Sequence, residues 1–272
     1  MLYTIYNVSG LKDVRNGTWK LRKRLLKINN TISFDGFRMI LDENSYMDLS
    51  LFKQYLRYGE YEKEITHYLR NSLNPGETFV DVGANSGYYS LLASGIVGEQ
   101  GMVLAFEPYK ETFRRLIKNI QLNEANNVKA FNMALSSYDG RGTLNISRSS
   151  DGLNSLKTIP LVEDSIEIEV KKFDSVFTFK RNVDVIKIDA EGSELDIIKG
   201  ASDSITNNKD IKIIFEINRY SPESQSTIDK LKTFGFISFT MENGKLSKQI
   251  SNLEEIPAGT DNLVALREEP IE

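Results

Sequence analysis

The chain contains no cysteine and only one histidine, His67, among its 272 residues. Without cysteine there is no disulfide framework, no thiolate nucleophile and no cysteine zinc site. A single histidine also excludes metal motifs that need paired imidazoles. Ordinary polar and aromatic residues surround His67, so we interpret it as an incidental histidine rather than a general base.

A long apolar run and an excess of basic charge are also missing. No segment approaches the ~18 apolar residues of a membrane span, and the N-terminus lacks the apolar core of a signal peptide. The net charge of −4 argues against nucleic acid as the main partner, because binding to phosphates needs a basic face. We therefore expect a cytoplasmic protein without stable membrane insertion and without a nucleic-acid partner; the sequence leaves a homo-oligomer open.

The residues that are present predict an α/β fold. A hydrophobic content of 40% with 26% charged residues is ordinary for a globular protein with one large domain. From Thr78 onward, strand-like and helix-like segments alternate, which predicts a parallel sheet covered on both faces. The predicted strands are 78–82, 102–107, 128–133, 183–188, 212–217, 236–241 and 262–267. The predicted helices are 87–97, 110–123, 193–199 and one that starts at Ser221-Pro222.

Residues 1–70 are predicted to form a small cap of helix and hairpin, and residues 71–272 the main domain. An Asp-Gly pair in the middle of 32–41 predicts a β-hairpin, and an apolar face predicts a helix at 60–72. Leucines and cations at 20–27 are typical of a short amphipathic helix, which we interpret as packed on the domain.

The simple alternation stops between the third and fourth core strands. Period-two patterning at 143–147 and 166–170 predicts two antiparallel strands. Between them, residues 149–159 are rich in Ser, Asn, Asp and Gly, which predicts a loop long enough to act as a lid.

A glycine-bracketed turn follows the first core strand. Gly83, Asn85 and Gly87 let the chain reverse into a helix, which brings backbone N–H groups close to a ligand. The spacing differs from the G-x-G-x-x-G of dinucleotide folds, and Asp81 precedes it. Because Asp81 would repel a pyrophosphate, the loop favours a ligand such as S-adenosylmethionine, which carries a sulfonium and an amino group and no phosphate.

A second acid stands at the end of the next strand. Glu107 follows a buried run that ends at Phe106, and it lies 20 residues after Gly87. An acid at this place is positioned to accept hydrogen bonds from both hydroxyls of an adenosine ribose. The glycine loop and Glu107 together therefore predict an adenosyl ligand.

The fourth core strand carries a lysine and ends in acids. Lys187 is unusual inside a central strand, because an unpaired buried ammonium is costly. Alternation places it on the same face as Asp189, which we expect to be its ion-pair partner. Capping by Ser193 and the attraction of Glu191 and Glu194 to a helix N-terminus explain only part of this cluster.

Glu216 and Asn218 end the neighbouring strand. With Asp189 they offer oxygen ligands of the kind that Mg²⁺ or Ca²⁺ prefers, although no local ligand motif specifies a metal. One carboxylate, Asp189 before Glu216, is alternatively predicted to take a proton from a substrate hydroxyl. We favour the reading without a metal.

Taken together, these residues resemble the FkbM family of S-adenosylmethionine-dependent methyltransferases. The resemblance covers roughly residues 55–220, and its most distinctive string is 187–194. The other matching strings are 59–62, 79–87, 106–108, 132–135 and Glu216. The family implies a class I, Rossmann-like fold: a seven-stranded, mostly parallel sheet flanked by helices, with the last strand antiparallel.

The resemblance also implies roles for the site residues. Asp81, Gly83, Asn85 and Gly87 would line the methionine part of the donor, and Glu107 would bind the ribose. Asn132, Met133 and Ala134 would surround the adenine. Asp189, Lys187 and Glu216 would serve the chemistry, which in this family is usually transfer of a methyl group to a hydroxyl on a sugar, a glycan or a secondary metabolite.

Two other functions stay open at this point. A nucleotide-sugar oxidoreductase on a related sheet usually has a Tyr-x-x-x-Lys pair, and no tyrosine of this chain has a lysine four residues on. A binding module that kept the fold and lost turnover is the other alternative. The sequence also lacks the Asp/Asn-Pro-Pro-Tyr string, which argues against amino-group methylation of DNA bases.

Overall fold

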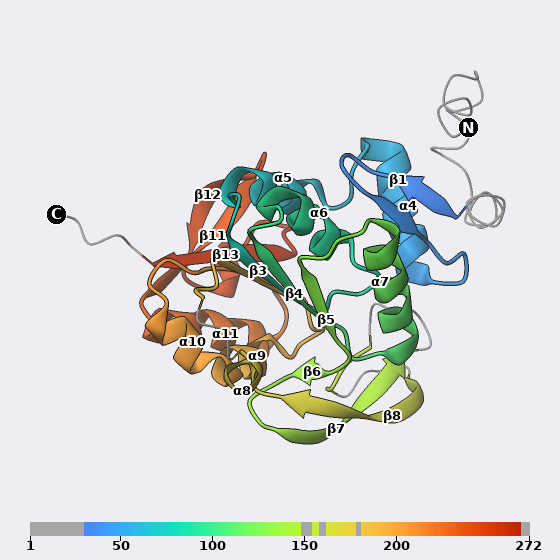
Figure 1. The fold of residues 1–272 in the computed structure, drawn as a ribbon. Coiled ribbons are helices and arrows are strands. Elements are labelled where there is room, and N and C mark those ends of the chain that lie inside the picture. The colour runs from blue at the N-terminus through green and yellow to red at the C-terminus, as the bar shows by residue number, and fades with distance from the viewer. Residues whose placement is uncertain (1–29, 148–153, 158–161, 178–180, 268–272) are drawn as a thin grey trace.

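An eight-stranded sheet forms the core of the protein (Figure 1). The computed structural model describes residues 30–147, 154–157, 162–177 and 181–267. In spatial order the strands are β12 (Lys245–Ile250), β11 (Phe236–Glu242), β13 (Asn262–Arg267), β10 (Lys212–Glu216), β9 (Val185–Ile188), β3 (Thr78–Val82), β4 (Met102–Phe106) and β5 (Val128–Phe131). Neighbouring strands from β10 to β5 are parallel, whereas β13 is antiparallel to both β10 and β11.

Seven of these strands have the arrangement expected for the class I methyltransferase fold, including the antiparallel last strand. The sequence analysis missed the eighth strand, β12, because five of its six residues are exposed and give no apolar alternation. β12 pairs with β11 through a two-residue turn, Asn243-Gly244, in which φ is 52° and 69°. Positive φ at both turn positions is the geometry that an Asn-Gly pair favours, so this pair was the available signal.

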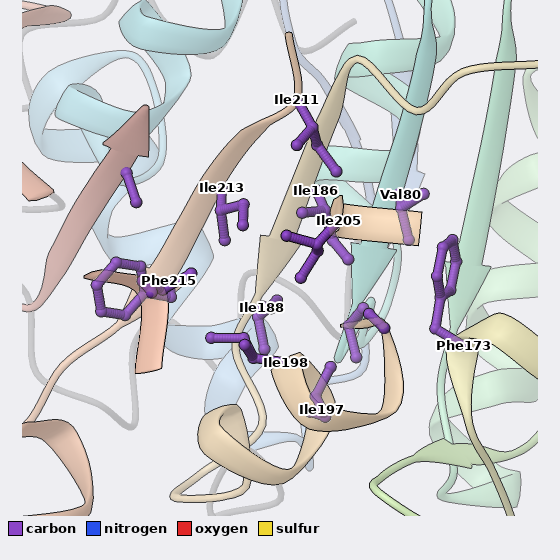
Figure 2. Packing of buried hydrophobic residues seen from close by; sticks show 14 of the residues in the cluster. Val80, Phe173, Ile186, Ile188, Ile197, Ile198, Ile205, Ile211, Ile213 and Phe215 are labelled. Atoms are coloured by element: carbon purple, nitrogen blue, oxygen red, sulfur yellow. The ribbon is translucent and has the colours of Figure 1, made fainter. Parts of the chain in front are cut away.

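Helices cover both faces of the sheet (Figure 1). On one face, α6 (Tyr88–Val97) packs beside α5 (Lys63–Ser72) in a cluster that includes Phe79, Val103 and Val185. On the other face lie α8 (Phe173–Val176), α9 (Glu194–Gly200), α10 (Ser202–Asn207) and α11 (Pro222–Thr233). Figure 2 shows this second cluster, in which Val80, Ile186 and Phe215 of the strands meet Ile197 and Ile205 of the helices. Successive strand residues thus enter opposite clusters, as the period of a strand requires.

One more helix and a 3-10 turn complete the main domain. α7 (Lys110–Leu122) packs through Leu116 on Ala84 and Ala105, next to the glycine loop. The 3-10 turn η2 (Leu253–Glu255) joins β12 to β13.

Before the main sheet, the described chain forms a hairpin and two helices. The predicted hairpin is confirmed as β1 (Thr31–Ser33) paired with β2 (Arg38–Ile40), and the predicted helix at 60–72 is α5. The sequence analysis missed α4 (Tyr46–Tyr58). Its signals were Ser45, whose side chain accepts from the backbone N–H of Asp48, and Gly59, which ends the helix at φ 81°.

A smaller three-stranded sheet adjoins the main one, with the order β6 (Ala134–Leu135), β8 (Val162–Lys171), β7 (Gly140–Ser147). The antiparallel pairing of β7 with β8 confirms the two strands predicted at 143–147 and 166–170. The strand predicted at 128–133 ends earlier, at Phe131, because the chain leaves the main sheet and joins β8 at Ala134.

Two predicted segments fall wholly or partly outside the described residues. These are the amphipathic helix at 20–27 and most of the loop at 149–159, of which only 154–157 is described. Among the helices that the structure does describe, none has the length and apolar character needed to cross a membrane.

Candidate active site

A pocket lies where β3, β4 and β9 end, and its walls come from both the main and the small sheet. It encloses about 1030 Å³ of empty space, part of which is open to solvent. Five of the predicted cofactor-binding residues line it: Gly83, Asn85, Glu107, Met133 and Ala134. Lys187 and Asp189 line it as well. The carboxyl ends of parallel strands are the usual place for a ligand in an α/β sheet.

The glycine loop is shaped by a close approach between two strand ends. Gly83 has φ 79°, and a Cβ atom there would lie 1.8 Å from the backbone oxygen of Asp189. Gly87 has φ 100°, and a Cβ atom there would lie 2.7 Å from the side chain of Leu116. Gly83 thus lets the loop touch the end of β9, whereas Gly87 serves packing on α7 and does not belong to the pocket wall.

Glu107 is buried and held by the backbone on both oxygens. Oε2 accepts from the N–H of Asn85 at 2.9 Å, and Oε1 accepts from the N–H of Tyr109 at 2.8 Å. Burial raises the pKa of Glu107 to about 7, although both backbone bonds oppose this shift. Because each carboxylate oxygen has two lone pairs, both oxygens can still accept from a ligand.

Asn132 lies beside this carboxylate rather than in the pocket. Its Nδ2 donates to the backbone oxygens of Glu107 and Pro108 at 2.9 and 3.0 Å. The exposed side chain therefore fixes the turn after β4, while the adjacent Met133 and Ala134 reach the pocket. This contact with the backbone differs from the direct adenine contact that the resemblance implied for Asn132.

The ion pair predicted between Lys187 and Asp189 is present. Lys187 Nζ donates to Asp189 Oδ2 at 2.8 Å and lies 4.7 Å from the centre of the Tyr89 ring. Burial by itself would lower the pKa of Lys187, but the carboxylates of Asp189, Asp81 and Glu62 together raise it above the usual value. The buried ammonium therefore stays charged.

Asp81 stands directly beside Lys187 in the parallel pairing of β3 with β9. Its Oδ2 accepts from Ser90 Oγ at 2.6 Å, whereas Oδ1 is buried without a hydrogen-bond partner among the described residues. Burial raises the pKa of Asp81, and the nearby Lys187 opposes that rise. Asp81 does not line the pocket, and the role predicted for it at the methionine part of the donor stays a prediction.

Asp189 belongs to a cluster of three carboxylates. Oxygens of Asp189, Glu191 and Glu216 come within 4.8 Å of one another. Burial, followed by the charge of Asp189, raises the pKa of Glu191 to about 8 and that of Glu216 to about 10. Glu191 lines the pocket and Glu216 does not. The side chain of Asn218 is exposed, and its Oδ1 accepts from the backbone N–H of Tyr220 at 3.0 Å.

The start of α9 differs from the predicted cap. Ser193 stands at the N-cap position, but its side chain makes no capping hydrogen bond. Glu194 Oε1 instead accepts from the N–H groups of Ala190 and Gly192 at 3.1 and 3.2 Å. Glu194 therefore closes the turn, which leaves the hydroxyl of Ser193 on the pocket side. Capping by Ser193 was the wrong prediction: its hydroxyl makes no bond to the first turn of α9, and Glu194 instead binds N–H groups that precede the helix.

Sequence reasoning assigned no role to Glu62, which the structure brings close to the ion pair. Tyr89 donates its hydroxyl to Glu62 Oε2 at 2.6 Å, and Glu62 has φ 37°. Burial raises the pKa of Glu62, and the charge of Asp189 adds to the rise. The signal was present, because Glu62 ends the string 59–62 that carries part of the resemblance.

The N-terminal elements are also tied to the glycine loop. Ser86 Oγ donates to Asp48 Oδ1 of α4 at 2.8 Å, and both residues line the pocket. Asn119 of α7 donates to the backbone oxygen of Ser86 at 2.8 Å and accepts from the N–H of Ile40 at 2.7 Å. These contacts join the hairpin, α4 and the loop into one unit.

The sheet order and the acid-lined pocket define a class I methyltransferase fold. The model of the methyltransferase FkbM domain matches residues 81–243, which is more than half of the chain. This chain therefore belongs to the FkbM family of methyltransferases. A second family model, protein-L-isoaspartate(D-aspartate) O-methyltransferase, matches residues 13–144.

Two curated fungal proteins are similar to this chain. Methyltransferase 1 of Beauveria bassiana (strain ARSEF 2860) is 28% identical over 47% of this chain and 60% of its own length. Methyltransferase sdnD of Sordaria araneosa is 26% identical over 60% of this chain and 74% of its own length. The chain thus spans 60% of the Beauveria protein.

Solved structures with a similar fold include two methyltransferases. FkbM methyltransferase from Methylobacillus flagellatus is 17% identical, with a TM-score of 0.46 over 94% of this chain and 60% of that one. A SAM-dependent O-methyltransferase from Thermotoga maritima is 15% identical, with a TM-score of 0.46 over 86% of this chain and 74% of that one.

Proposed function

We propose that this protein transfers a methyl group from S-adenosylmethionine to a hydroxyl of a sugar, a glycan or a secondary metabolite. The observation that carries the proposal is the pairing of Glu107 with the glycine loop at the pocket. Glu107 Oε2 accepts a hydrogen bond from the backbone N–H of Asn85. The carboxylate that we expect to bind the ribose and the glycine loop therefore form one wall of the pocket. An unpaired oxygen of Asp81 behind the loop adds a second point of attraction for a cationic ligand.

The residues present fit this donor. When bound, S-adenosylmethionine supplies an electrophilic methyl group on a sulfonium. Glu107 would bind the ribose hydroxyls, and the backbone of Gly83 and Asn85 would face the methionine part. Met133 and Ala134 would contact the adenine. The carboxylate of Asp189 on the pocket wall would favour a ligand that carries positive charge over a neutral one.

For the chemistry, Asp189 is the first candidate to take the proton from the acceptor hydroxyl. It lines the pocket, and its bond to Lys187 fixes the orientation of one carboxylate oxygen. Glu216, the second candidate, does not line the pocket, and its raised pKa leaves it protonated at neutral pH, so Asp189 is the better choice. Positioning of the acceptor against the donor in a closed pocket would supply much of the rate.

The charge at the pocket wall supports a neutral acceptor over a carboxylate acceptor. The isoaspartate family that matches residues 13–144 is named for methylation of a carboxyl group. Here Asp189 stands on the pocket wall at the end of β9, where its negative charge would disfavour a carboxylate acceptor. A neutral hydroxyl acceptor avoids this repulsion.

Calorimetry with S-adenosylhomocysteine tests the donor assignment. Glu107→Ala removes two charge-assisted hydrogen bonds to the ribose, each worth about 1.5–3 kcal/mol. We expect affinity to fall by at least about 10-fold in a variant that remains folded. Equal affinity for parent and variant would remove the ribose assignment. Release of label from methyl-labelled donor then separates an enzyme from a binding module without turnover.

A further inference from the structure

Two buried polar groups on the pocket wall have no hydrogen-bond partner within the part of the chain that the structure describes. They are the amide Nδ2 of Asn154 and the hydroxyl of Ser193, and no group among the described residues bonds to either. Both residues line the pocket, and Ser193 is only 3% exposed. Buried polar groups in native proteins are almost always paired, because an unmade hydrogen bond is costly. These two atoms are therefore placed to bind a ligand.

The orientation of the Asn154 amide is fixed by its neighbour. Asn154 Oδ1 accepts from the backbone N–H of Ser147 at 2.9 Å. A backbone N–H can only donate, so the amide oxygen must face Ser147 and the NH2 group must point elsewhere. The group left without a partner at the pocket is therefore a donor, which calls for an acceptor atom on the ligand.

Asn154 and Ser193 lie on adjoining walls of the pocket. Ser155 Oγ donates to the backbone oxygen of Glu191 at 2.7 Å, and Lys157 forms an ion pair with Asp196. The segment 154–157 is thus docked on the turn that precedes α9. Because these contacts hold the two walls together, we expect one ligand edge to meet both groups.

The surroundings of these two groups are apolar. Leu156 packs with Leu144 and Ala134 in the core of the small sheet. Ile197 and Met133 approach the pocket from the second cluster of the main sheet. A flat apolar ring with polar atoms on its edge matches these walls, and Ala134 and Met133 already stand where the adenine is expected.

We propose that Asn154 and Ser193 bind the edge of the donor adenine. This inference rests on the proposed function, since it assigns one part of the same donor. The Asn154 NH2 group donates to a ring nitrogen of adenine, and the Ser193 hydroxyl accepts from the exocyclic amine or donates to a second ring nitrogen. The segment 154–157 therefore takes part in donor recognition, together with the main sheet.

The test is the binding of S-adenosylhomocysteine to Asn154→Asp, measured by calorimetry. Aspartate keeps an oxygen for the N–H of Ser147 and loses the NH2 donor, so we expect about 10-fold weaker binding. Ser193→Ala is expected to weaken binding several-fold. The matched control is Asn252→Asp, because Asn252 Oδ1 also accepts from a backbone N–H, that of Glu254, and Asn252 does not line the pocket. This control is expected to bind like the parent.

Three ligand analogues identify the contact. In each, one of the adenine nitrogens N1, N3 or N7 of S-adenosylhomocysteine is replaced by carbon. We expect one analogue to bind the parent about 10-fold more weakly than the natural ligand, and that penalty to vanish in Asn154→Asp. Equal penalties in both proteins would overturn the assignment.

The remaining outcomes distinguish a wrong adenine assignment from a wrong methyl donor. If folded Asn154→Asp binds S-adenosylhomocysteine like the parent but needs more acceptor for turnover, Asn154 belongs to the acceptor site and the adenine assignment is wrong. If the parent binds none of the four ligands, the proposed donor itself is wrong, and the inference falls with it.

Discussion

Lys187 Nζ lies 2.8 Å from Asp189 Oδ2, and this pair links the buried centre of the sheet to the pocket. The lysine is 1% exposed on its side chain, whereas the aspartate is 32% exposed. The buried ammonium of Lys187 therefore holds the partly exposed carboxylate of Asp189 in place. Because truncation of one partner of a buried pair leaves the other uncompensated, the pair is expected to matter for both stability and chemistry.

Asp189→Asn separates donor binding from methyl transfer. The substitution keeps size and hydrogen bonding but removes the negative charge, so we expect turnover to fall by roughly 10²–10⁴-fold if Asp189 takes the proton. Affinity for S-adenosylhomocysteine should change little. Lys187→Met should lower turnover by less, and it should also destabilise the fold. Thermal unfolding of both variants is the control, and parent-like turnover in both would make the pair purely structural.

The pKa of Glu107 gives donor binding a pH dependence. Burial raises this pKa to about 7, and the ribose hydroxyls need the ionised carboxylate. Affinity for S-adenosylhomocysteine should therefore rise as the pH rises through about 7, by up to about 10-fold between pH 6 and 8. Glu107→Gln should bind more weakly and without this slope. A parent whose affinity stays flat over that range would contradict the assignment.

Gly83→Ala tests the close approach of the loop to β9. A Cβ atom would lie 1.8 Å from the Asp189 backbone oxygen, and alanine also disfavours φ 79°. We expect a loss of at least about 2 kcal/mol in the free energy of unfolding, together with weak donor binding. Gly95→Ala is the matched control, because nothing lies within 4 Å of a Cβ there and alanine favours a helix. Denaturant unfolding measures both.

Glu216→Gln tests whether the three carboxylates hold a metal ion or a proton. Burial and the charge of Asp189 raise the pKa of Glu216 to about 10, so we expect a proton at neutral pH and little effect of glutamine on turnover. Because the pKa of Glu216 is higher in the folded than in the unfolded protein, the free energy of unfolding should fall as the pH rises from about 4.5, the unfolded pKa, toward 10. The glutamine variant should lack that loss.

Glu216→Gln also tests the alternative, a metal ion held by the three carboxylates. If a chelator abolishes methyl transfer, added Mg²⁺ restores it, and Glu216→Gln inactivates the enzyme, then Asp189, Glu191 and Glu216 form a metal centre. If turnover survives the chelator, methyl transfer needs no metal ion at this cluster. Donor binding without metal is the control for general damage to the site.

Local patterns in the sequence determined the parts of the site that lie within one strand and its following turn. The period of a strand placed Lys187 and Asp189 on one face, and their bond confirms it. The glycine spacing and the acid after β4 likewise predicted where the loop and Glu107 lie. Each of these features depends on residues a few positions apart, whose geometry the backbone itself sets.

Only the tertiary structure decided the contacts between distant segments. Asp189 is the reason that position 83 must be glycine, Glu62 reaches the ion pair through Tyr89, and Asn154 reaches the pocket from the small sheet. No local period encodes such contacts, because they depend on how separate elements pack. The exposed strand β12 escaped prediction for a related reason: its pairing with β11 forms it, and its own residues carry no apolar pattern.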